Sequence, residues 1–558
     1  MKRTSYLVAL VGVLVWGVAA PRTRAELKLP ARAAHIGAAA WSIQFDSDWR
    51  VVGGLPEKAM VISLQGLANR LAPQLYIMQA PDYQWEIPGP LYEFYQRRYQ
   101  VRFTEIKTGA AVLELFKGHA KGYVVWDPQV SSSLNVAFTI AGLEDAVVVT
   151  ADLIPLVEKA RLKQIDDLRG RYTGQADVQI YQDAYDRYWA RCNHDAVMLM
   201  GGQMGAVMVP AMADIGVAQR MFFEALAANP KYPEETALER RILAGVNRDG
   251  YVFGWHPYSK DTEEQHVTLT STYGLKMEGL YNLPNLSFNC LFTVTPGFKY
   301  ANRHSVARDA QLTPGPKVYI SFVQSDQMGL SAWTSPDRGK MPFAWQVPMD
   351  WSLFSPAALQ YFYESATPND YLIGGLSAPS YMYPKHIPAD RFAPLMQEAG
   401  AMMQLLDLPV LEILDNSAAD GNVGNADLPK DIVDRYYEAF PDVIGFVNGY
   451  GPAHTRDLRD SRPMISYDYY IDPNRPRDAV AADMNELIAL NPRRPYFLLV
   501  HVRETNSVAS LVAMITQLRG PVEIVPLDVF LKLAASAKTY QTCFEYPDEV
   551  KHFSGFGK

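Results

Sequence analysis

KVYISFVQ, the segment from Lys317 to Gln324, decides the fold, because it opens an alternation of apolar runs and helical stretches that continues almost to the end of the chain. A short, continuous apolar run rich in β-branched and aromatic residues is typical of a strand buried on both faces. Strands that alternate with helices pair in parallel through right-handed crossovers. The second half of the chain is therefore predicted to be a β/α domain.

Six further apolar runs predict the other strands of this domain. They are Tyr371–Leu376, Pro409–Leu414, Val443–Val447, Pro463–Tyr467, Tyr496–Val502 and Val522–Val525. Seven strands favour a closed or nearly closed, TIM-like β/α barrel in residues 306–545, slightly shorter than the usual length of about 250 residues. An open doubly wound sheet gives the same pattern and is the alternative.

The first half of the chain also mixes strands and helices. GYVVWD (Gly122–Asp127) and DAVVVT (Asp145–Thr150) are β-branched runs separated by a helical stretch. A chain of 558 residues exceeds what one hydrophobic core accommodates. We therefore expect two α/β domains, in residues 26–130 and 131–305, before the barrel.

Residues 1–25 are typical of a secretory signal peptide. Lys2 and Arg3 precede an apolar run from Tyr6 to Ala20, and small residues up to Ala25 provide a cleavage site. The run is too short for a good membrane span, and no second long apolar run follows. The expectation is a secreted or periplasmic protein without a membrane span.

Charge and cysteine content exclude several functional classes. The net charge of −8 would become −12 after cleavage, and an acidic chain without a basic block is a poor nucleic-acid ligand. Three cysteines allow one disulfide at most, and no zinc-binding spacing occurs. We expect no metal and no cofactor, and the sequence leaves the oligomeric state open.

In β/α barrels the reactive residues lie at the carboxyl ends of the strands. The acids found there, which we predict to be catalytic, are Asp326, Asp415 and Glu504. The residues predicted to bind substrate are Ser380, Tyr381, Tyr383, Asn448 and His501, together with Trp255 from the GYVFGWHP segment of the first half. Paired carboxylates among aromatic rings are what glycoside hydrolysis requires.

Each of these residues also has a simpler interpretation. An acid after a strand, such as Asp415, is often a helix cap or turn former. Glu504 has the character of a solvated acid favoured by a helix N-terminus. His501 lies inside an apolar strand, as core histidines do, and Tyr381 and Tyr383 have the alternative of simply packing their loop.

The proline-rich loop GLSAPSYMYPKHIP (Gly375–Pro388) carries a family resemblance. The passage from Gly339 to Pro384 resembles the core of the GxGYxYP family, which is named for glycoside hydrolases. The motif falls on five residues of the loop, with Ala and Ser in place of both glycines: Ala378, Ser380, Tyr381, Tyr383 and Pro384. Since these residues penalise positive φ, the loop is expected to run differently here.

The resemblance covers most of the mature chain and implies an exported, sugar-processing protein with several N-terminal domains before a barrel-like domain. It also singles out Asp326 as the acid left in QSDQ (Gln324–Gln327), where the family carries an Asp-Gly-Asp-Asn run. The function expected is hydrolysis of a poly- or oligosaccharide. A non-catalytic carbohydrate-binding protein and a metal-assisted deacetylase are the alternatives.

Overall fold

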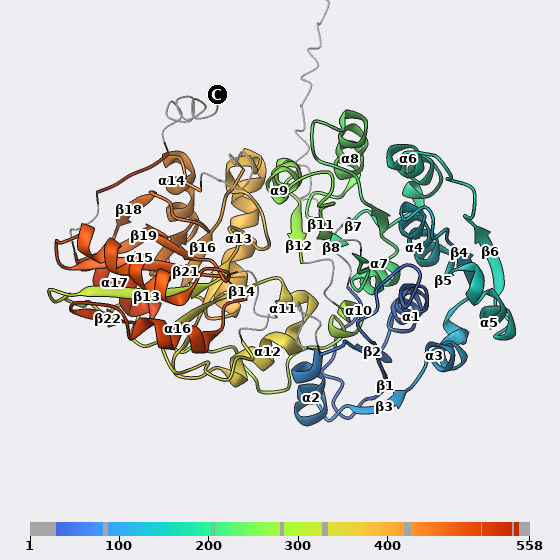
Figure 1. Ribbon diagram of the computed structural model, residues 1–558, viewed down its shortest axis with the longest axis horizontal. Coiled ribbons are helices and arrows are strands. Elements are labelled where there is room, and N and C mark those ends of the chain that lie inside the picture. Colours follow the sequence, from blue (N-terminus) through green and yellow to red (C-terminus); the bar gives the residue numbers. More distant parts are fainter. Residues whose placement is uncertain are drawn as a thin grey trace, which may run out of the picture.

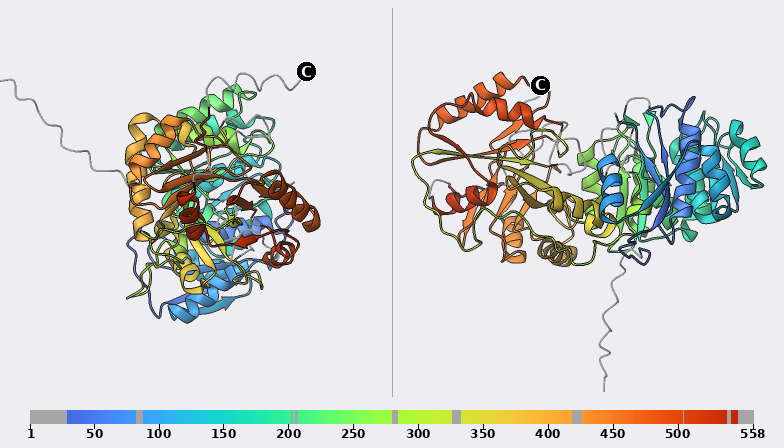
Figure 2. Two further views of the ribbon diagram at one scale, coloured as in Figure 1. Left: turned by 90° about the vertical axis from the view of Figure 1, so that its left-hand side faces the viewer. Right: turned by 90° about the horizontal axis from the view of Figure 1, so that it is seen from below.

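The computed structural model describes most of the chain after its first 28 residues, which include the predicted signal peptide. The described residues are 29–81, 88–201, 203–204, 207–279, 284–325, 333–417, 426–503, 505–537 and 541–545. Figure 1 shows the small N-terminal sheets on the right and a larger C-terminal sheet on the left. From below, they form two lobes that meet at a narrower junction (Figure 2).

The first two sheets each have three parallel strands. Their strands are β1 (Ala39–Gln44), β2 (Leu75–Met78) and β3 (Arg102–Ile106), in the order β2-β1-β3, and β4 (Gly122–Val125), β5 (Ala146–Val149) and β6 (Lys163–Asp167), in the order β5-β4-β6. Their helices are α1 (Leu55–Ala68), α2 (Pro88–Arg98), α3 (Gly109–Phe116), α4 (Ser132–Glu144), α5 (Ile154–Lys159) and α6 (Asp177–Tyr188).

Helix α1 joins these sheets into one body. All of its residues except Glu57 are buried, and it packs against α3 on one side and β5 and α7 (Ala213–Gln219) on the other. A helix that is apolar all round is stable only when it is buried on every face. The N-terminal domains therefore pack against one another around α1.

A third parallel sheet has the order β10-β7-β11-β12 and leads to the junction between the lobes. Its strands are β7 (Ala196–Met200), β10 (Phe222–Glu224), β11 (Tyr251–Trp255) and β12 (Lys276–Glu278). The helices beside it are α7, α8 (Pro233–Gly245), α9 (Glu263–Thr272) and α10 (Leu286–Asn289), and a short antiparallel pair joins β8 (Gln203–Met204) and β9 (Val207–Met208). The prediction of α/β structure in the first half is confirmed.

The C-terminal sheet has ten strands, and all its pairs are parallel except β18 with β19. The strands are β13 (Val318–Gln324), β14 (Phe343–Pro348), β15 (Asp370–Gly375), β16 (Val410–Ile413), β17 (Gly445–Asn448), β18 (Arg456–Arg459), β19 (Arg462–Ser466), β20 (Tyr469–Ile471), β21 (Tyr496–Val502) and β22 (Val522–Ile524). Their order is β18-β19-β17-β16-β15-β14-β13-β21-β20, and β22 also pairs with β13. All seven predicted strands are present, and β14, β18 and β20 are additions.

This sheet is curled. β19 and β20 lie near opposite ends of the strand order, yet only Tyr467 and Asp468 separate them in the chain. The amide of Tyr467 donates to the carbonyl of Asn448 in β17 (3.1 Å), and that of Asp468 donates to the carbonyl of Leu499 in β21 (2.9 Å). The prediction of a β/α domain built on a parallel sheet is confirmed, whereas the closed, TIM-like barrel of seven strands stays a prediction, since this sheet has ten strands.

The inner face of the curled sheet is apolar toward the beginnings of its strands. There Tyr319, Tyr371 and Phe497 form one buried cluster with Phe530 and Leu531 of α17 (Leu527–Ser536). The remaining helices of this domain are α11 (Trp351–Phe354), α12 (Pro356–Ser365), α13 (Ala389–Leu405), α14 (Lys430–Ala439), α15 (Arg477–Leu490) and α16 (Val508–Ile515). Helix α17 thus fills one end of the interior, and the carboxyl ends of the strands lie at the other.

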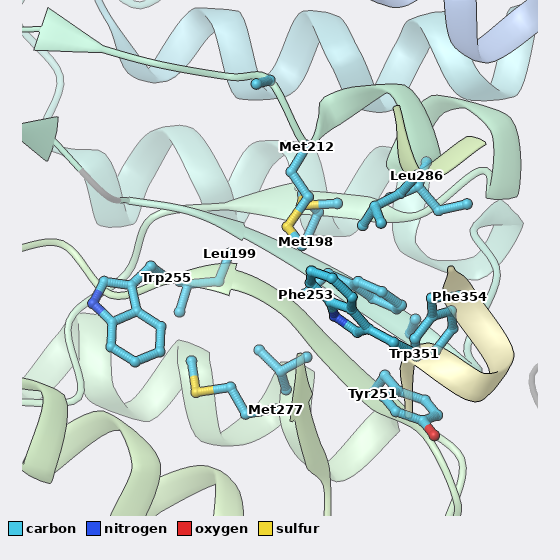
Figure 3. Packing of buried hydrophobic residues seen from close by; sticks show 14 of the residues in the cluster. Met198, Leu199, Met212, Tyr251, Phe253, Trp255, Met277, Leu286, Trp351 and Phe354 are labelled. Carbon is cyan, nitrogen blue, oxygen red and sulfur yellow. The ribbon is translucent and has the colours of Figure 1, made fainter. Parts of the chain in front are cut away.

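Helix α11 connects the C-terminal domain to the third sheet. Trp351 and Phe354 pack against strand β11, where the Phe354 ring lies 5.0 Å from that of Tyr251 and 5.1 Å from that of Phe253 (Figure 3). The indole Nε1 of Trp351 donates to Glu278 at 2.8 Å. The third domain and the C-terminal domain therefore share one hydrophobic core.

Candidate functional site

A polar layer lies on the inner face of the curled sheet, near the carboxyl ends of its strands. Glu412 of β16 is fully buried and accepts a hydrogen bond from the hydroxyl of Tyr467 at 2.5 Å. His501 of β21 lies 5.0 Å from the Tyr467 ring, and its Nε2 is 2.7 Å from the hydroxyl of Ser325. Four strand ends thus bring polar groups to the part of the interior where β/α enzymes place their chemistry.

The histidine of this layer is neutral. Burial lowers the pKa of His501 to about 3, so its imidazole carries no charge at neutral pH. Tyr450 and Tyr470 pack against it, with ring centroids 4.3 and 5.4 Å away. His501 is therefore a buried hydrogen-bonding group that packs against the rings of Tyr450 and Tyr470.

Two other predicted residues serve as hydrogen-bonding supports in the structure. Asp415 is fully buried, and its carboxylate accepts from the amide of Lys385 (2.8 Å) and from the amide (3.0 Å) and hydroxyl (2.5 Å) of Ser417. The amide nitrogen of Asn448 donates to Ala426 (3.0 Å) and to Ser466 (2.9 Å). Asp415 makes the contacts of a turn former, and its catalytic role stays a prediction.

The other two predicted acids, Asp326 and Glu504, lie outside the described residues. Their catalytic roles also stay predictions. Glu412 was not among the predicted acids, because it lies inside β16 and not after its end. The signal was present, since an acid at the centre of the apolar run PVLEIL (residues 409–414) is rarely buried without a partner.

The proline-rich loop Gly375–Pro388, called the tyrosine loop below, lies at the interface between the C-terminal and third domains. The hydroxyl of Ser380 donates to the carbonyl of Met277, and Tyr381 exchanges backbone hydrogen bonds with Met277 at 3.2 and 3.3 Å. The amide of Tyr383 donates to the hydroxyl of Ser271 at 2.9 Å. The rigid loop therefore presents its two phenols to the neighbouring domain.

The phenols of this loop converge on a carboxylate of α9. The Tyr381 hydroxyl donates to Glu263 at 2.5 Å and lies 3.2 Å from the Tyr383 hydroxyl. Trp255 stacks on Tyr381 with a centroid distance of 6.2 Å and an angle of 13° between the rings. Trp255, Ser380 and Tyr383 are buried in this interface, whereas Tyr381 and Glu263 are half-buried.

A buried acid pair lies on the other side of the loop. The carboxyls of Glu278, at the end of β12, and Asp350, after β14, hydrogen-bond to each other. Burial raises the pKa of Asp350 to about 6 and that of Glu278 well above its ordinary value, and the charge of Asp350 raises the pKa of Glu278 further. The pair shares a proton near neutral pH and so joins the two domains.

Three further properties of the described part of the chain limit what the site contains. No group of three or more His, Cys, Asp or Glu side chains there is placed to hold a metal ion. All three cysteines, Cys192, Cys290 and Cys543, are free thiols. None of the described helices combines the length and apolar character of a membrane span.

Comparison with known families covers most of the chain. Residues 42–118, 120–192 and 194–291 match the first, second and third N-terminal domains of GxGYxYP proteins, and residues 316–535 match the "GxGYxYP putative glycoside hydrolase C-terminal domain". The chain belongs to the GxGYxYP family. The resemblance predicted from the tyrosine loop is confirmed, and the three N-terminal family domains correspond to the three small parallel sheets.

A solved structure supports the same fold for this GxGYxYP protein. It is described as a "putative hydrolase" from Bacteroides thetaiotaomicron, and the similarity spans 90% of this chain and 96% of that one with a TM-score of 0.74. At 19% sequence identity this similarity shows the fold alone. No curated protein matches the chain.

The replaced glycines of the GxGYxYP motif leave the backbone unstrained. Within the described part of the loop, Ser377 has a positive φ (70°), and neither Ala378 nor Ser380 does. The Ser377 hydroxyl compensates by bonding the backbone of Leu414 in both directions, at 2.7 and 2.9 Å. The side chains of Ala378 and Ser380 therefore carry no left-handed penalty.

Restoring the second glycine of the motif is expected to destabilise this protein. The variant Ser380→Gly loses the hydrogen bond to Met277 and gains chain entropy when unfolded, so its free energy of unfolding should fall by about 1–2 kcal/mol. Urea unfolding measures the change, and Ser380→Ala, which lacks only the hydroxyl, should lose less. A more stable Ser380→Gly would contradict the backbone assignment.

Proposed function

We propose that this protein is an exported hydrolase of poly- or oligosaccharides, with its site at the carboxyl edge of the curled C-terminal sheet. The observation that carries the proposal is the buried carboxyl of Glu412, which faces Tyr467 in a polar layer above an otherwise apolar interior. Burying a carboxyl group costs free energy, and functional sites are where such groups are retained.

The position of the layer supports the same conclusion. Ser325 directly follows β13 and precedes Asp326, the acid that the family resemblance singles out. Glu412 lies on β16, which is three strands away from β13 in the order of the sheet. A glycosidase needs two acids, one to protonate the leaving oxygen and the other to act as base or nucleophile, and we assign these roles to Asp326 and Glu412.

The test is hydrolysis of a panel of purified polysaccharides and aryl glycosides, followed by the appearance of reducing ends or released phenol. Wild-type protein should turn over at least one member. The variants Asp326→Asn and Glu412→Gln should each lose at least about a hundredfold in kcat/KM, the scale of one acid–base group. Glu438→Gln, on the exposed side of α14, is the matched control and should keep wild-type activity.

Two outcomes would overturn parts of the proposal. Full activity in Glu412→Gln would show that Glu412 is not a catalytic residue. The catalytic acids would then have to be other residues at the carboxyl edge of the sheet. Calorimetric binding of an oligosaccharide with no turnover on any substrate would make the protein a carbohydrate-binding member of the family, without hydrolase activity.

A further inference from the structure

The third domain presents a carboxylate to the same edge of the C-terminal sheet. Glu263 opens α9, which packs against η4 (Pro384–His386) within the tyrosine loop. Glu263 is half-buried, and its carboxylate accepts a hydrogen bond from the hydroxyl of Tyr381. Figure 1 shows α9 at the junction of the lobes, beside α13.

The contacts of Glu263 favour its ionised form. Burial raises the pKa of Tyr381 well above its ordinary value, so this phenol stays protonated and donates its hydrogen to the carboxylate. A hydrogen bond from a neutral donor favours the charged form of an acid, as does a place in the first turn of a helix. The neighbouring Tyr383 hydroxyl, 3.2 Å from that of Tyr381, extends the chain of donors.

The surroundings of Glu263 suit a sugar. Tyr258 is 47% exposed, and its ring lies 4.5 Å from that of His256, so an aromatic face is available to solvent beside the carboxylate. Burial raises the pKa of Tyr258 to about 12; the charge of Glu263 adds to the shift and that of Arg503 opposes it. Tyr258 thus lies near both Glu263 of α9 and Arg503, which follows β21.

We propose that Glu263 is the ionised catalytic carboxylate of the hydrolytic site and that the active site is shared between the third and C-terminal domains. This inference rests on the proposed function, and it gives the role of base to Glu263, which leaves the role of acid to only one of Asp326 and Glu412. Glu263 takes a proton from the attacking water, whose oxygen bonds to the anomeric carbon. The bond from that carbon to the glycosidic oxygen breaks, and the oxygen leaves with a proton from an acid of the C-terminal sheet. The base then releases its proton to solvent, and the acid regains one.

The first experiment compares Glu263→Gln with Glu264→Gln on a glycoside that the wild-type protein hydrolyses. Glu264 is the next residue on the same helix and is equally half-buried, which makes it a matched control. We expect Glu263→Gln to lose at least about a hundredfold in kcat/KM, and Glu264→Gln to stay within about twofold of wild type.

The second experiment separates catalysis from structure. In Glu263→Ala, sodium azide should restore turnover and yield a glycosyl azide, because a small anion then takes the place of the activated water. A residue that only supports the fold gives no such rescue. In Tyr381→Phe, Glu263 loses its hydrogen bond, so the acidic limb of the pH profile of kcat/KM should move to higher pH.

Each outcome decides between the two proposals. Activity above a tenth of wild type in Glu263→Gln, with no effect of azide on Glu263→Ala, overturns the role of Glu263 and leaves the hydrolase function standing. A wild-type protein that hydrolyses no glycoside in the panel overturns both.

Discussion

Replacing Trp351 with alanine is expected to lower the free energy of unfolding by about 3–5 kcal/mol, the usual loss when a buried tryptophan is truncated. The ring is 5% exposed and lies with Phe354 in the core that the third and C-terminal domains share (Figure 3). The variant also removes the Nε1 donor of Glu278, which leaves that carboxyl buried with one hydrogen bond fewer. Urea unfolding followed by circular dichroism measures the loss.

Two further variants show where the loss arises. Trp351→Phe keeps most of the apolar volume and loses only the Nε1 donor, so it should lose clearly less than the alanine variant. Leu490→Ala, at a position that is 70% exposed, should stay within about 0.5 kcal/mol of wild type. Hydrogen exchange should increase in β11 and β12 of Trp351→Ala, and an unchanged pattern there would show that α11 does not hold the domains together.

The local pattern of the sequence was sufficient to predict most of the C-terminal sheet. Runs such as YFLLVHV (Tyr496–Val502) are short, apolar and rich in β-branched residues, and each became a strand. β14 was missed because FAWQVP (Phe343–Pro348) contains a glutamine, ends in proline and has a single β-branched residue. β20 was missed because its pairing depends on the change of partner at Asp468, from β17 to β21, which no local pattern encodes.

The candidate site was predicted only as far as the strand ends could be located. Tyr381 was predicted as a site residue from its place in the loop after β15, and this role stays a prediction; its hydrogen-bond partner Glu263 precedes it by 118 positions and belongs to another domain. A single sequence contains no signal for such a pair. The segment SKDTEE (Ser259–Glu264) is polar throughout, as surface turns are, and its local pattern does not indicate a contact with another domain.

The fold of the third domain is expected to weaken as the pH rises, because two carboxyls are buried together. Glu224, at the end of β10, and Glu239, on α8, are fully buried and hydrogen-bonded to each other. Burial raises the pKa of both, that of Glu224 to about 8, and the charge of Glu224 raises the pKa of Glu239 further. Asp261 adds to these upward shifts, and Lys260 partly offsets that of Glu224.

A raised pKa in the folded state means that the native protein binds protons more tightly than the unfolded chain does. The contribution of the protonated pair to the free energy of unfolding is therefore complete below about pH 4, the range in which an unfolded glutamate is protonated. This contribution is lost as the pH rises toward 8. The pair alone should reduce the free energy of unfolding by a few kcal/mol over that range, since one unit of pKa shift corresponds to about 1.4 kcal/mol.

Glu239→Gln tests this directly, because glutamine keeps the shape and hydrogen-bonding capacity of the protonated acid and cannot ionise. Relative to wild type, the variant should gain stability at pH 8 and show little change at pH 5, as measured by urea unfolding at both values. Glu234→Gln, on the exposed face of the same helix, should differ from wild type by the same small amount at both pH values. An equal effect of Glu239→Gln at pH 5 and pH 8 would mean that the pair is already ionised in the native protein, and its burial would then require a different explanation.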